Sequence, residues 1–266
     1  MLIDFHTHAF PDSLAERAIA SLRVHIDAVP HTDGTIDDLI RTMDESGTDR
    51  SVVCNIATNA RQVTHVNDFA IDTLRRYGDR ITPLGSIHPG YEKPYEEVER
   101  LRAAGIAGLK IHPDYMRTMI DDDAFDPIFD AAADAGMFLV THTGIDVAYP
   151  DKIHATPDGI LSRLKRSPKA VLVAAHFGQN FRPLDALEKL AGQELYLDVS
   201  LCALAKVPKD VAAAILLKHD SDRLLFGTDC PWATQRDTFE YVDSLPIPTE
   251  LKEKIFWRNA ARLLGL

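Results

Sequence analysis

Eight short apolar segments are spaced along the whole chain, each followed by an amphipathic segment, and this alternation constrains the fold more than any other feature. Strands that are covered on both faces read as continuous apolar runs, and strands that alternate with helices form parallel βαβ units. Eight such units fit a closed (β/α)8 TIM barrel of the α/β class. The predicted strands lie within residues 1–10, 51–56, 81–87, 106–111, 137–141, 170–175, 195–200 and 223–227.

Capping signals and helically spaced apolar residues place a helix after each strand. For example, Thr35 is a predicted N-cap, and Gly47 is predicted to end the same helix. Residues 27–34 are expected to form a loop above the barrel. The other helices are expected at residues 11–24, 62–77, 94–104, 123–135, 158–166, 183–191 and 209–219, with two extra C-terminal helices at 236–244 and 249–264.

An open, doubly wound sheet is the structural alternative to the barrel. No glycine-rich phosphate-binding motif follows the first strand to support it. The chain also has no low-complexity tract and no convincing linker. We therefore expect one domain that spans residues 1–266.

Charge and cysteine usage exclude several classes of partner. A formal net charge of −11 argues against binding to nucleic acid or to an anionic membrane, because both require a basic surface. Three scattered cysteines and the absence of a signal-peptide pattern favour a cytoplasmic protein. We expect a small-molecule substrate as the partner, and assembly as a homodimer or a higher homo-oligomer is left open.

Histidines are concentrated where the predicted strands end. Catalytic groups of (β/α)8 barrels lie at the C-terminal ends of the strands, so this clustering is the strongest functional signal in the sequence. Six of the eleven histidines occupy such positions: His6, His8, His88, His112, His142 and His176.

Four of the residues at strand ends are candidate ligands of one divalent metal. His6 and His8 are two residues apart on the first strand, so both imidazoles point to the same side. Asp229 ends the last strand, which neighbours the first in a closed barrel, and His142 ends the fifth. This donor set suits Zn²⁺ best, and also Mn²⁺, Fe²⁺ or Co²⁺. The alternatives are surface histidines at 6 and 8, a core histidine at 142 and a turn or N-cap aspartate at 229.

Two residues are candidates for proton transfer. Asp229 could accept a proton from a metal-bound water as well as binding the metal. The ordinary pKa of histidine is close to neutrality, so His176 could polarise a substrate carbonyl or carry a proton. His176 could instead bind a second metal or support a ligand by a hydrogen bond.

Lys110 lies inside the fourth predicted strand, where a buried ammonium needs a partner. Three interpretations are open: it binds a substrate carboxylate, it is carbamylated and bridges two metals, or it forms a salt bridge to Asp4 or Asp198.

Other residues at the strand ends could line a substrate pocket. His88 and His112 could do so, although each is followed by a proline and could simply cap a turn. Trp232, Tyr149 and Phe177 could shape the pocket or only pack. Cys230 has no identifiable basic partner, which favours packing over a nucleophilic role.

The motifs at the strand ends together resemble the amidohydrolase superfamily, in particular the amidohydrolase-related (amidohydrolase 2) branch that includes aminocarboxymuconate-semialdehyde decarboxylase. The resemblance covers the whole chain in the right order. It implies that His6, His8, His142 and Asp229 bind one divalent metal and that His176 is the acid/base residue. The motifs are HTH at 6–8, GLKIHP at 108–113, THTG at 141–144, AHFG at 175–178 and GTDCPW at 227–232.

Three functions follow from these observations. The first is a metal-dependent hydrolase, in which metal-bound hydroxide attacks an ester, lactone or amide carbonyl and His176 stabilises the oxyanion or protonates the leaving group. The second is a nonoxidative decarboxylase of a small aromatic or muconate-type acid, since the resembling branch contains both activities. The third is a non-catalytic metal-binding barrel.

Overall fold

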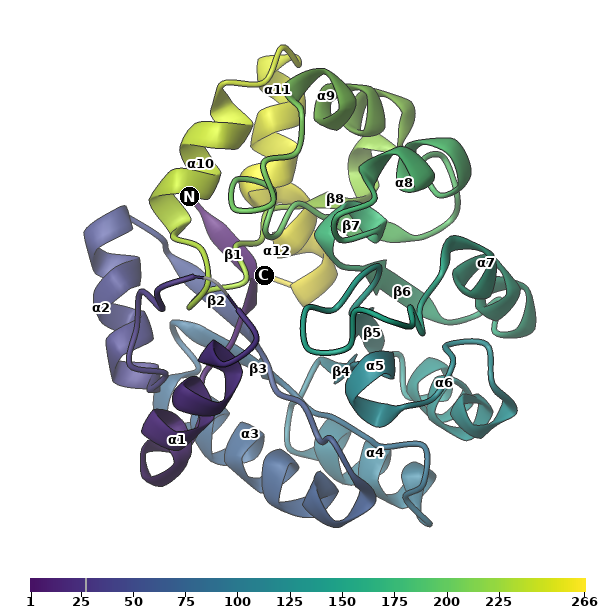
Figure 1. Ribbon diagram of the computed structural model, residues 1–266. Helices are drawn as coiled ribbons and strands as arrows, with labels where there is room; N and C mark the ends of the chain where they lie inside the picture. The colour runs from purple at the N-terminus through teal and green to yellow at the C-terminus, as the bar shows by residue number, and fades with distance from the viewer. Residues whose placement is uncertain (27) are drawn as a thin grey trace.

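The computed structural model describes residues 1–26 and 28–266; of the predicted loop at 27–34, Asp27 lies outside the described residues. Figure 1 looks along a ring of strands surrounded by helices, in which the chain passes round the ring in sequence order. The strands are β1 (Ile3–Thr7), β2 (Arg50–Cys54), β3 (Ile81–Leu84), β4 (Gly108–Ile111), β5 (Phe138–Thr141), β6 (Val171–Ala174), β7 (Tyr196–Asp198) and β8 (Leu224–Leu225).

All neighbouring strands are parallel and form two sheets, β1-β2-β3 and β4-β5-β6-β7-β8. Hydrogen bonds join the two sheets at both seams. Between β3 and β4, Gly85 N donates to Gly108 O (3.0 Å) and Lys110 N donates to Gly85 O (2.7 Å). Between β8 and β1, Phe5 N donates to Phe226 O (2.8 Å). This order confirms the (β/α)8 barrel, because a doubly wound sheet would not pair its last strand with its first.

Most strands are shorter than the apolar runs that predicted them. The seventh run, 195–200, gives only Tyr196–Asp198, and the eighth, 223–227, gives only Leu224–Leu225. At these ends the chain leaves the ladder: Leu201 and Asp229 both have positive φ angles, 59° and 69°. The residues beyond the strands are therefore free to turn side chains over the mouth of the barrel.

The helices lie where the periodicity predicts them, with ends set by local capping. Thr35 accepts a hydrogen bond from Asp38 N at the start of α2, and Gly47 ends that helix in the left-handed conformation. The helices are α1 (Asp12–Arg23), α2 (Ile36–Ser46), α3 (Val63–Tyr77), α4 (Pro94–Ala103), α5 (Pro113–Met116), α6 (Asp126–Asp134), α7 (Pro157–Arg166), α8 (Pro183–Lys189), α9 (Lys209–Lys218), α10 (Gln235–Asp243), α11 (Thr249–Glu253) and α12 (Asn259–Leu264).

Two features of the helices differ from the prediction. The short helix α5 follows β4 directly, in a stretch for which the sequence predicted no helix; Pro113 stands in its first turn, and the His112 side chain accepts a hydrogen bond from Tyr115 N. The predicted helix at 249–264 contains a π-helical turn, η5 (Lys254–Arg258), between α11 and α12. In this turn Ile255 O accepts a hydrogen bond from Phe226 N (2.9 Å), so the turn is anchored to the end of β8.

The apolar core has an inner and an outer part. Inside the ring, Phe5 and Phe138 lie 5.4 Å apart between ring centroids, with Val52, Val140 and Leu225 buried in the same cluster. The larger cluster lies between the strands and the surrounding helices. Among the described residues, no helix is long and apolar enough to cross a membrane.

Candidate active site

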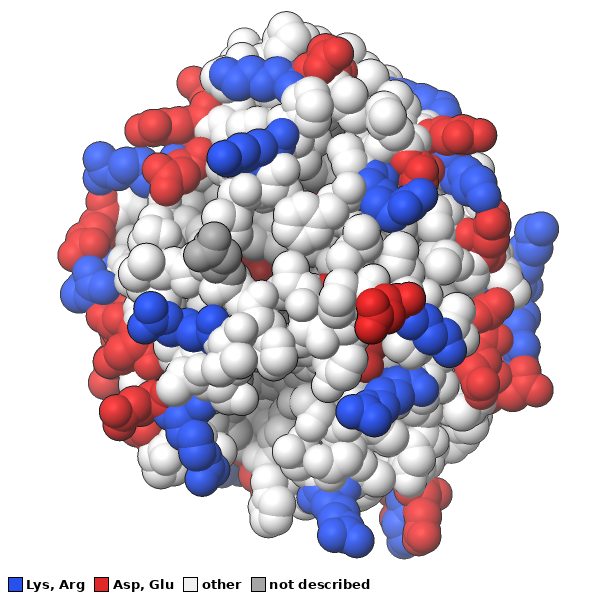
Figure 2. Space-filling view, in the orientation of Figure 1, with Lys and Arg blue, Asp and Glu red and all other residues white. Residues whose placement is uncertain are grey.

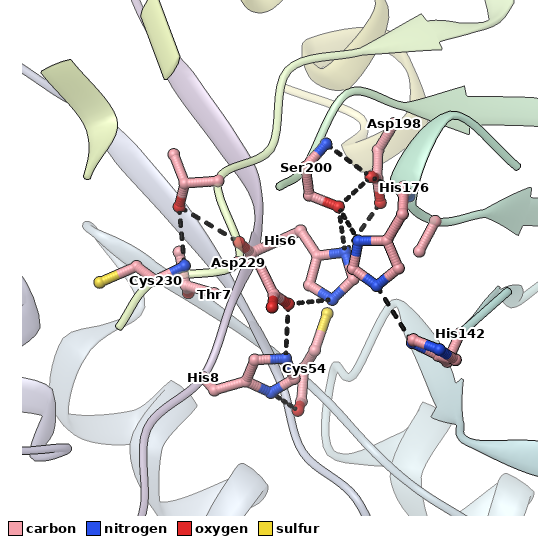
Figure 3. A network of polar contacts seen from close by, with 12 residues as sticks. His6, Thr7, His8, Cys54, His142, His176, Asp198, Ser200, Asp229 and Cys230 are labelled. Carbon is pink, nitrogen blue, oxygen red and sulfur yellow. Dashed lines mark hydrogen bonds and ion pairs between the residues drawn. The ribbon is translucent and has the colours of Figure 1, made fainter. Parts of the chain in front are cut away.

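Three of the four predicted metal ligands meet at the end of β1 (Figure 3). His6 and His8 point to the same side, as their spacing predicts, and Asp229 reaches them from the turn after β8. Asp229 Oδ1 lies 3.2 Å from His6 Nε2 and 3.1 Å from His8 Nε2. Asp229 N donates to His6 O (2.7 Å), which fixes the turn against β1.

The hydrogen bonds made by the Nδ1 atoms of His6 and His8 determine the tautomers of both rings, and so determine that Nε2 is the acceptor atom beside Asp229. His6 Nδ1 lies 2.8 Å from Asp198 Oδ2, and His8 Nδ1 lies 2.9 Å from the carbonyl oxygen of Cys54. Carbonyl and ionised carboxylate oxygens only accept, so both Nδ1 atoms carry the proton. In the neutral imidazoles both Nε2 atoms therefore present lone pairs to the Asp229 oxygen.

Three acceptor atoms in contact are unfavourable unless a positive group lies beside them; Lys110 Nζ, 3.0 Å from His6 Nε2, is one such group, and a cation bound between the three atoms would be another. Burial and the charge of Lys110 lower the pKa of His6, which favours its neutral form. Burial alone would raise the pKa of Asp229, but the hydrogen bond to His8 and the neighbouring His6 and His176 hold it below the ordinary value, so the carboxylate is ionised. A divalent metal fits the same donor set, because imidazole and carboxylate are the ligands it prefers.

Lys110 lies in direct contact with this group. It is 1% exposed, and its Nζ is 3.0 Å from His6 Nε2. The predicted salt bridge to Asp4 or Asp198 is wrong: within residues 1–26 and 28–266, neither carboxylate pairs with Lys110. Both are already satisfied, Asp4 by the Thr228 hydroxyl (2.7 Å) and Asp198 by His6. Burial raises the pKa of Asp4 to about 7.

His142 is close to the metal-ligand candidates but does not belong to the group formed by His6, His8 and Asp229. Its Nδ1 lies 3.1 Å from His176 Nε2, and burial, with the charge of His176, lowers its pKa well below the ordinary value. His142 Nε2 is buried without a hydrogen-bond partner among the described residues. A buried imidazole lone pair without a partner is costly, and a ligand or metal would satisfy it.

His176 follows β6 in η3 (His176–Gly178), where its own φ is +56° and that of Phe177 is also +56°. Such angles are strained for residues other than glycine and are found at functional sites. Burial lowers the pKa of His176 from its ordinary value near neutrality to about 3. His176 is therefore neutral at pH 7.

His112 lies against His142 and belongs to a second group of candidate metal ligands, with His142 and Asp146. The rings of His112 and His142 are stacked 4.2 Å apart, and Tyr115 stacks on the other side of His112 at 3.9 Å. His112 Nε2 is 3.5 Å from Asp146 Oδ2, and burial raises the pKa of Asp146 to about 6. The sequence did not single out Asp146, which comes from the loop after β5.

The remaining pocket candidates have mainly structural contacts. His88 Nδ1 accepts a hydrogen bond from Gly90 N (3.0 Å), which agrees with the turn-capping interpretation. Cys230 is buried in an apolar cluster, where burial raises the pKa of its thiol. Trp232 and Phe177 are buried, while Tyr149 is half-buried at the edge of Tyr115.

Asp198 and Ser200 hydrogen-bond to the site histidines His6 and His176, and the sequence did not predict these contacts. Both lie at the end of β7, behind His6 and His176 (Figure 3). The sequence suggests Asp198 only as a partner of Lys110. Their spacing of two residues at a strand end, the same as in His6 and His8, is the signal that could have identified them.

Charged side chains lie mostly around the periphery of the molecule in the view of Figure 2. The centre of this face is largely uncharged, and only a little acidic surface is visible between the uncharged atoms.

The parallel ring of strands, with histidine and aspartate side chains gathered at the strand ends, defines a (β/α)8-barrel enzyme. A family model described as amidohydrolase matches residues 3–266, and the chain belongs to this family. A sequence search among curated proteins finds no match.

Solved structures with the same fold include decarboxylases and a hydrolase. A 5-carboxyvanillate decarboxylase from Sphingomonas paucimobilis has a TM-score of 0.74 and 17% identity, with 100% of this chain and 99% of that chain covered. A dihydroxybenzoic acid decarboxylase from Polaromonas, with bound manganese and 2-nitroresorcinol, has a TM-score of 0.73 and 16% identity, with coverages of 100% and 97%. A probable 2-pyrone-4,6-dicarboxylic acid hydrolase from Acinetobacter baumannii, with bound citric acid, has a TM-score of 0.71 and 16% identity, with coverages of 100% and 99%.

Proposed function

We propose that the chain is a metal-dependent hydrolase that cleaves an ester, lactone or amide bond of a small molecule. The observation that carries the proposal is the meeting of three acceptor atoms, His6 Nε2, His8 Nε2 and Asp229 Oδ1, with no hydrogen atom between them in their neutral tautomers. We further propose that residues 1–266 form one domain around this site.

The residues that would hold the metal are His6, His8 and Asp229, with His142 completing the set through its unpartnered Nε2. A bound divalent metal would supply Lewis-acid activation of water and of the substrate carbonyl. Zn²⁺ is the ion we favour from the donor set. Mn²⁺ is supported by the manganese in the similar dihydroxybenzoic acid decarboxylase.

The chain's own residues would then handle the protons. Asp229 lies beside the place where water would be activated, so its carboxylate can accept the proton that the water loses. His176 would be the second proton carrier and would pass to the leaving group a proton that it has first taken up. The Lys110 ammonium, 3.0 Å from His6 Nε2, adds positive charge next to the developing oxyanion. In an alternative arrangement the site would hold a second metal, bound either by His176 or by a carbamylated Lys110.

Nonoxidative decarboxylation is the second candidate. It is supported by the two decarboxylases of the same fold, which act on, or are inhibited by, substituted phenols and aromatic acids. In that reaction the ring carbon that loses CO2 must gain a proton, and Asp229 or His176 would deliver it.

Assays with two substrates distinguish hydrolysis from decarboxylation, and a metal analysis tests whether the chain binds the metal that both reactions need. The zinc- and manganese-loaded proteins are incubated with a 2-pyrone carboxylate and with a hydroxybenzoate, and ring opening and CO2 release are measured. Lactone opening without CO2 supports hydrolysis, and CO2 from the hydroxybenzoate supports decarboxylation. Asp229→Asn should abolish either activity, whereas exposed His65→Asn on α3 is the matched control. A chain that binds no stoichiometric metal would refute both.

We propose a small-molecule substrate as the partner and a cytoplasmic location, in keeping with the acidic chain and its sparse cysteines.

A further inference from the structure

Asp198, Ser200 and His176 form a buried chain of hydrogen bonds behind the site (Figure 3). The Ser200 hydroxyl donates to Asp198 Oδ1 in a short hydrogen bond, and Ser200 Oγ lies 2.7 Å from His176 Nδ1. All three residues are at most 5% exposed, so water does not compete for these contacts. The chain continues from His176 Nε2 to His142 Nδ1, 3.1 Å away.

Only one direction of donation is compatible with this geometry. Asp198 accepts at Oδ2 from His6 and at Oδ1 from the backbone N–H groups of His176 and Ser200 (3.0 Å each). With four donors around it, its carboxylate is ionised and cannot donate. The single hydrogen of the Ser200 hydroxyl is therefore used on Asp198. Ser200 Oγ has only lone pairs left for His176, whose Nδ1 must carry the proton.

We infer that Asp198 and Ser200 lock His176 in the Nδ1–H tautomer, which leaves the lone pair of His176 on Nε2. His142 Nδ1, 3.1 Å from that lone pair, must then carry the proton of the neutral His142 ring and donate it in a hydrogen bond to His176 Nε2. The lone pair of His142 is therefore left on its buried Nε2, which has no partner among the described residues.

Ser200 is thus a positioning residue that acts through His176. The use of the His142 lone pair by a metal rests on the proposed function, whereas the tautomer of His176 does not, so the two can fail separately. The hydrogen bond from His176 Nδ1 to Ser200 favours the Nδ1–H tautomer over the Nε2–H tautomer by about tenfold, the effect of one neutral hydrogen bond.

The experiment is ¹⁵N NMR of the histidine rings in the full-length protein, as purified and after saturation with diamagnetic Zn²⁺. The resonances of His176 are identified by their loss in His176→Gln. In the wild type we expect Nδ1 to be protonated and Nε2 to be unprotonated. Ser200→Ala should shift the tautomer ratio by about tenfold towards Nε2–H, and Ser200→Thr, which keeps the hydroxyl, should restore it.

Ser86→Ala is the matched control. Ser86 is a fully buried serine whose hydroxyl donates to Lys110 O (2.8 Å) and accepts from Ala57 N (3.0 Å), and it has no hydrogen bond to a histidine among the described residues. It should leave the His176 resonances in the wild-type pattern. An Nε2–H tautomer in the wild type, or an unchanged tautomer ratio in Ser200→Ala, would overturn the inference. Loss of lactone and hydroxybenzoate turnover with the Nδ1–H tautomer intact would instead count against the proposed function.

Discussion

Replacing Asp198 by asparagine should weaken metal binding although Asp198 is not one of the proposed ligands. Asp198 Oδ2 holds the proton of His6 on Nδ1, 2.8 Å away, and so keeps the lone pair of His6 on Nε2. In Asp198→Asn, an amide NH2 placed towards His6 would meet another donor. The His6 ring would then favour the tautomer with the proton on Nε2, which cannot bind a metal.

The size of the effect follows from the hydrogen bond that is lost. A hydrogen bond to a charged group contributes about 1.5–3 kcal/mol, which corresponds to a loss of about 10- to 100-fold in metal affinity, the range usual for residues that orient a ligand. Competition of the protein with a chromophoric zinc chelator measures this affinity directly.

Asp114→Asn is the matched control for this variant. Asp114 is also fully buried and also contacts a histidine, since its Oδ1 lies 2.9 Å from His154 Nδ1, but it contacts none of His6, His8 or Asp229. Its substitution should leave the zinc affinity unchanged. Equal affinities of Asp198→Asn and the wild type would refute the argument that Asp198 sets the His6 tautomer.

Three further predictions concern residues away from the metal. His219 accepts from Gly192 N (3.0 Å) and lies 2.9 Å from Leu195 O through Nε2, which only its neutral form can satisfy, and burial lowers its pKa. The unfolded chain therefore binds the extra proton first, and the free energy of unfolding should fall as the pH drops below about 6.5, by at most about 1.4 kcal/mol per pH unit from this group. Denaturant titrations at several pH values measure how steeply the free energy of unfolding falls with pH. This pH dependence should be weaker in His219→Gln than in the wild type, and an identical pH dependence would contradict the assignment. Arg163 is fully buried and donates to Ile120 O (2.9 Å), Asp122 O (2.7 Å) and Asp126. Arg163→Met should lower the free energy of unfolding by about 3–5 kcal/mol, whereas a loss below about 1 kcal/mol would show that these bonds add little net stability. Cys54, Cys202 and Cys230 are buried, and burial raises the pKa of the Cys54 thiol to about 12. The native protein should therefore resist iodoacetamide at pH 8 and react at all three cysteines only after unfolding, as mass spectrometry would show; rapid labelling of the native protein would disprove this.

The sequence predicted the barrel because each strand is buried on both faces, which leaves a continuous apolar run that needs no long-range information. It predicted the pairing of His6 and His8 because side chains two apart on a strand share a side. It did not predict the ends of β7 and β8, because apolar residues continue past the point where the backbone leaves the ladder, as at Val199 and Phe226.

The partners of the site residues were beyond the reach of the sequence for a different reason. Lys110 contacts His6, and not Asp4 or Asp198, because both carboxylates are saturated by hydroxyl and imidazole groups from distant strands. The neutrality of His176 likewise depends on burial by the completed barrel. The contact of Lys110 and the neutrality of His176 depend on which groups hydrogen-bond to each carboxylate and on burial. Both are determined only when the strands assemble into the barrel.

The most direct test of the central claim is the anomalous difference density of a crystal of the metal-loaded protein, collected at the absorption edge of zinc or manganese. We predict one peak about 2.0–2.2 Å from His6 Nε2, His8 Nε2 and an Asp229 carboxylate oxygen. A crystal with no peak at this position, or with its only peak beside His112 and Asp146, would contradict the account.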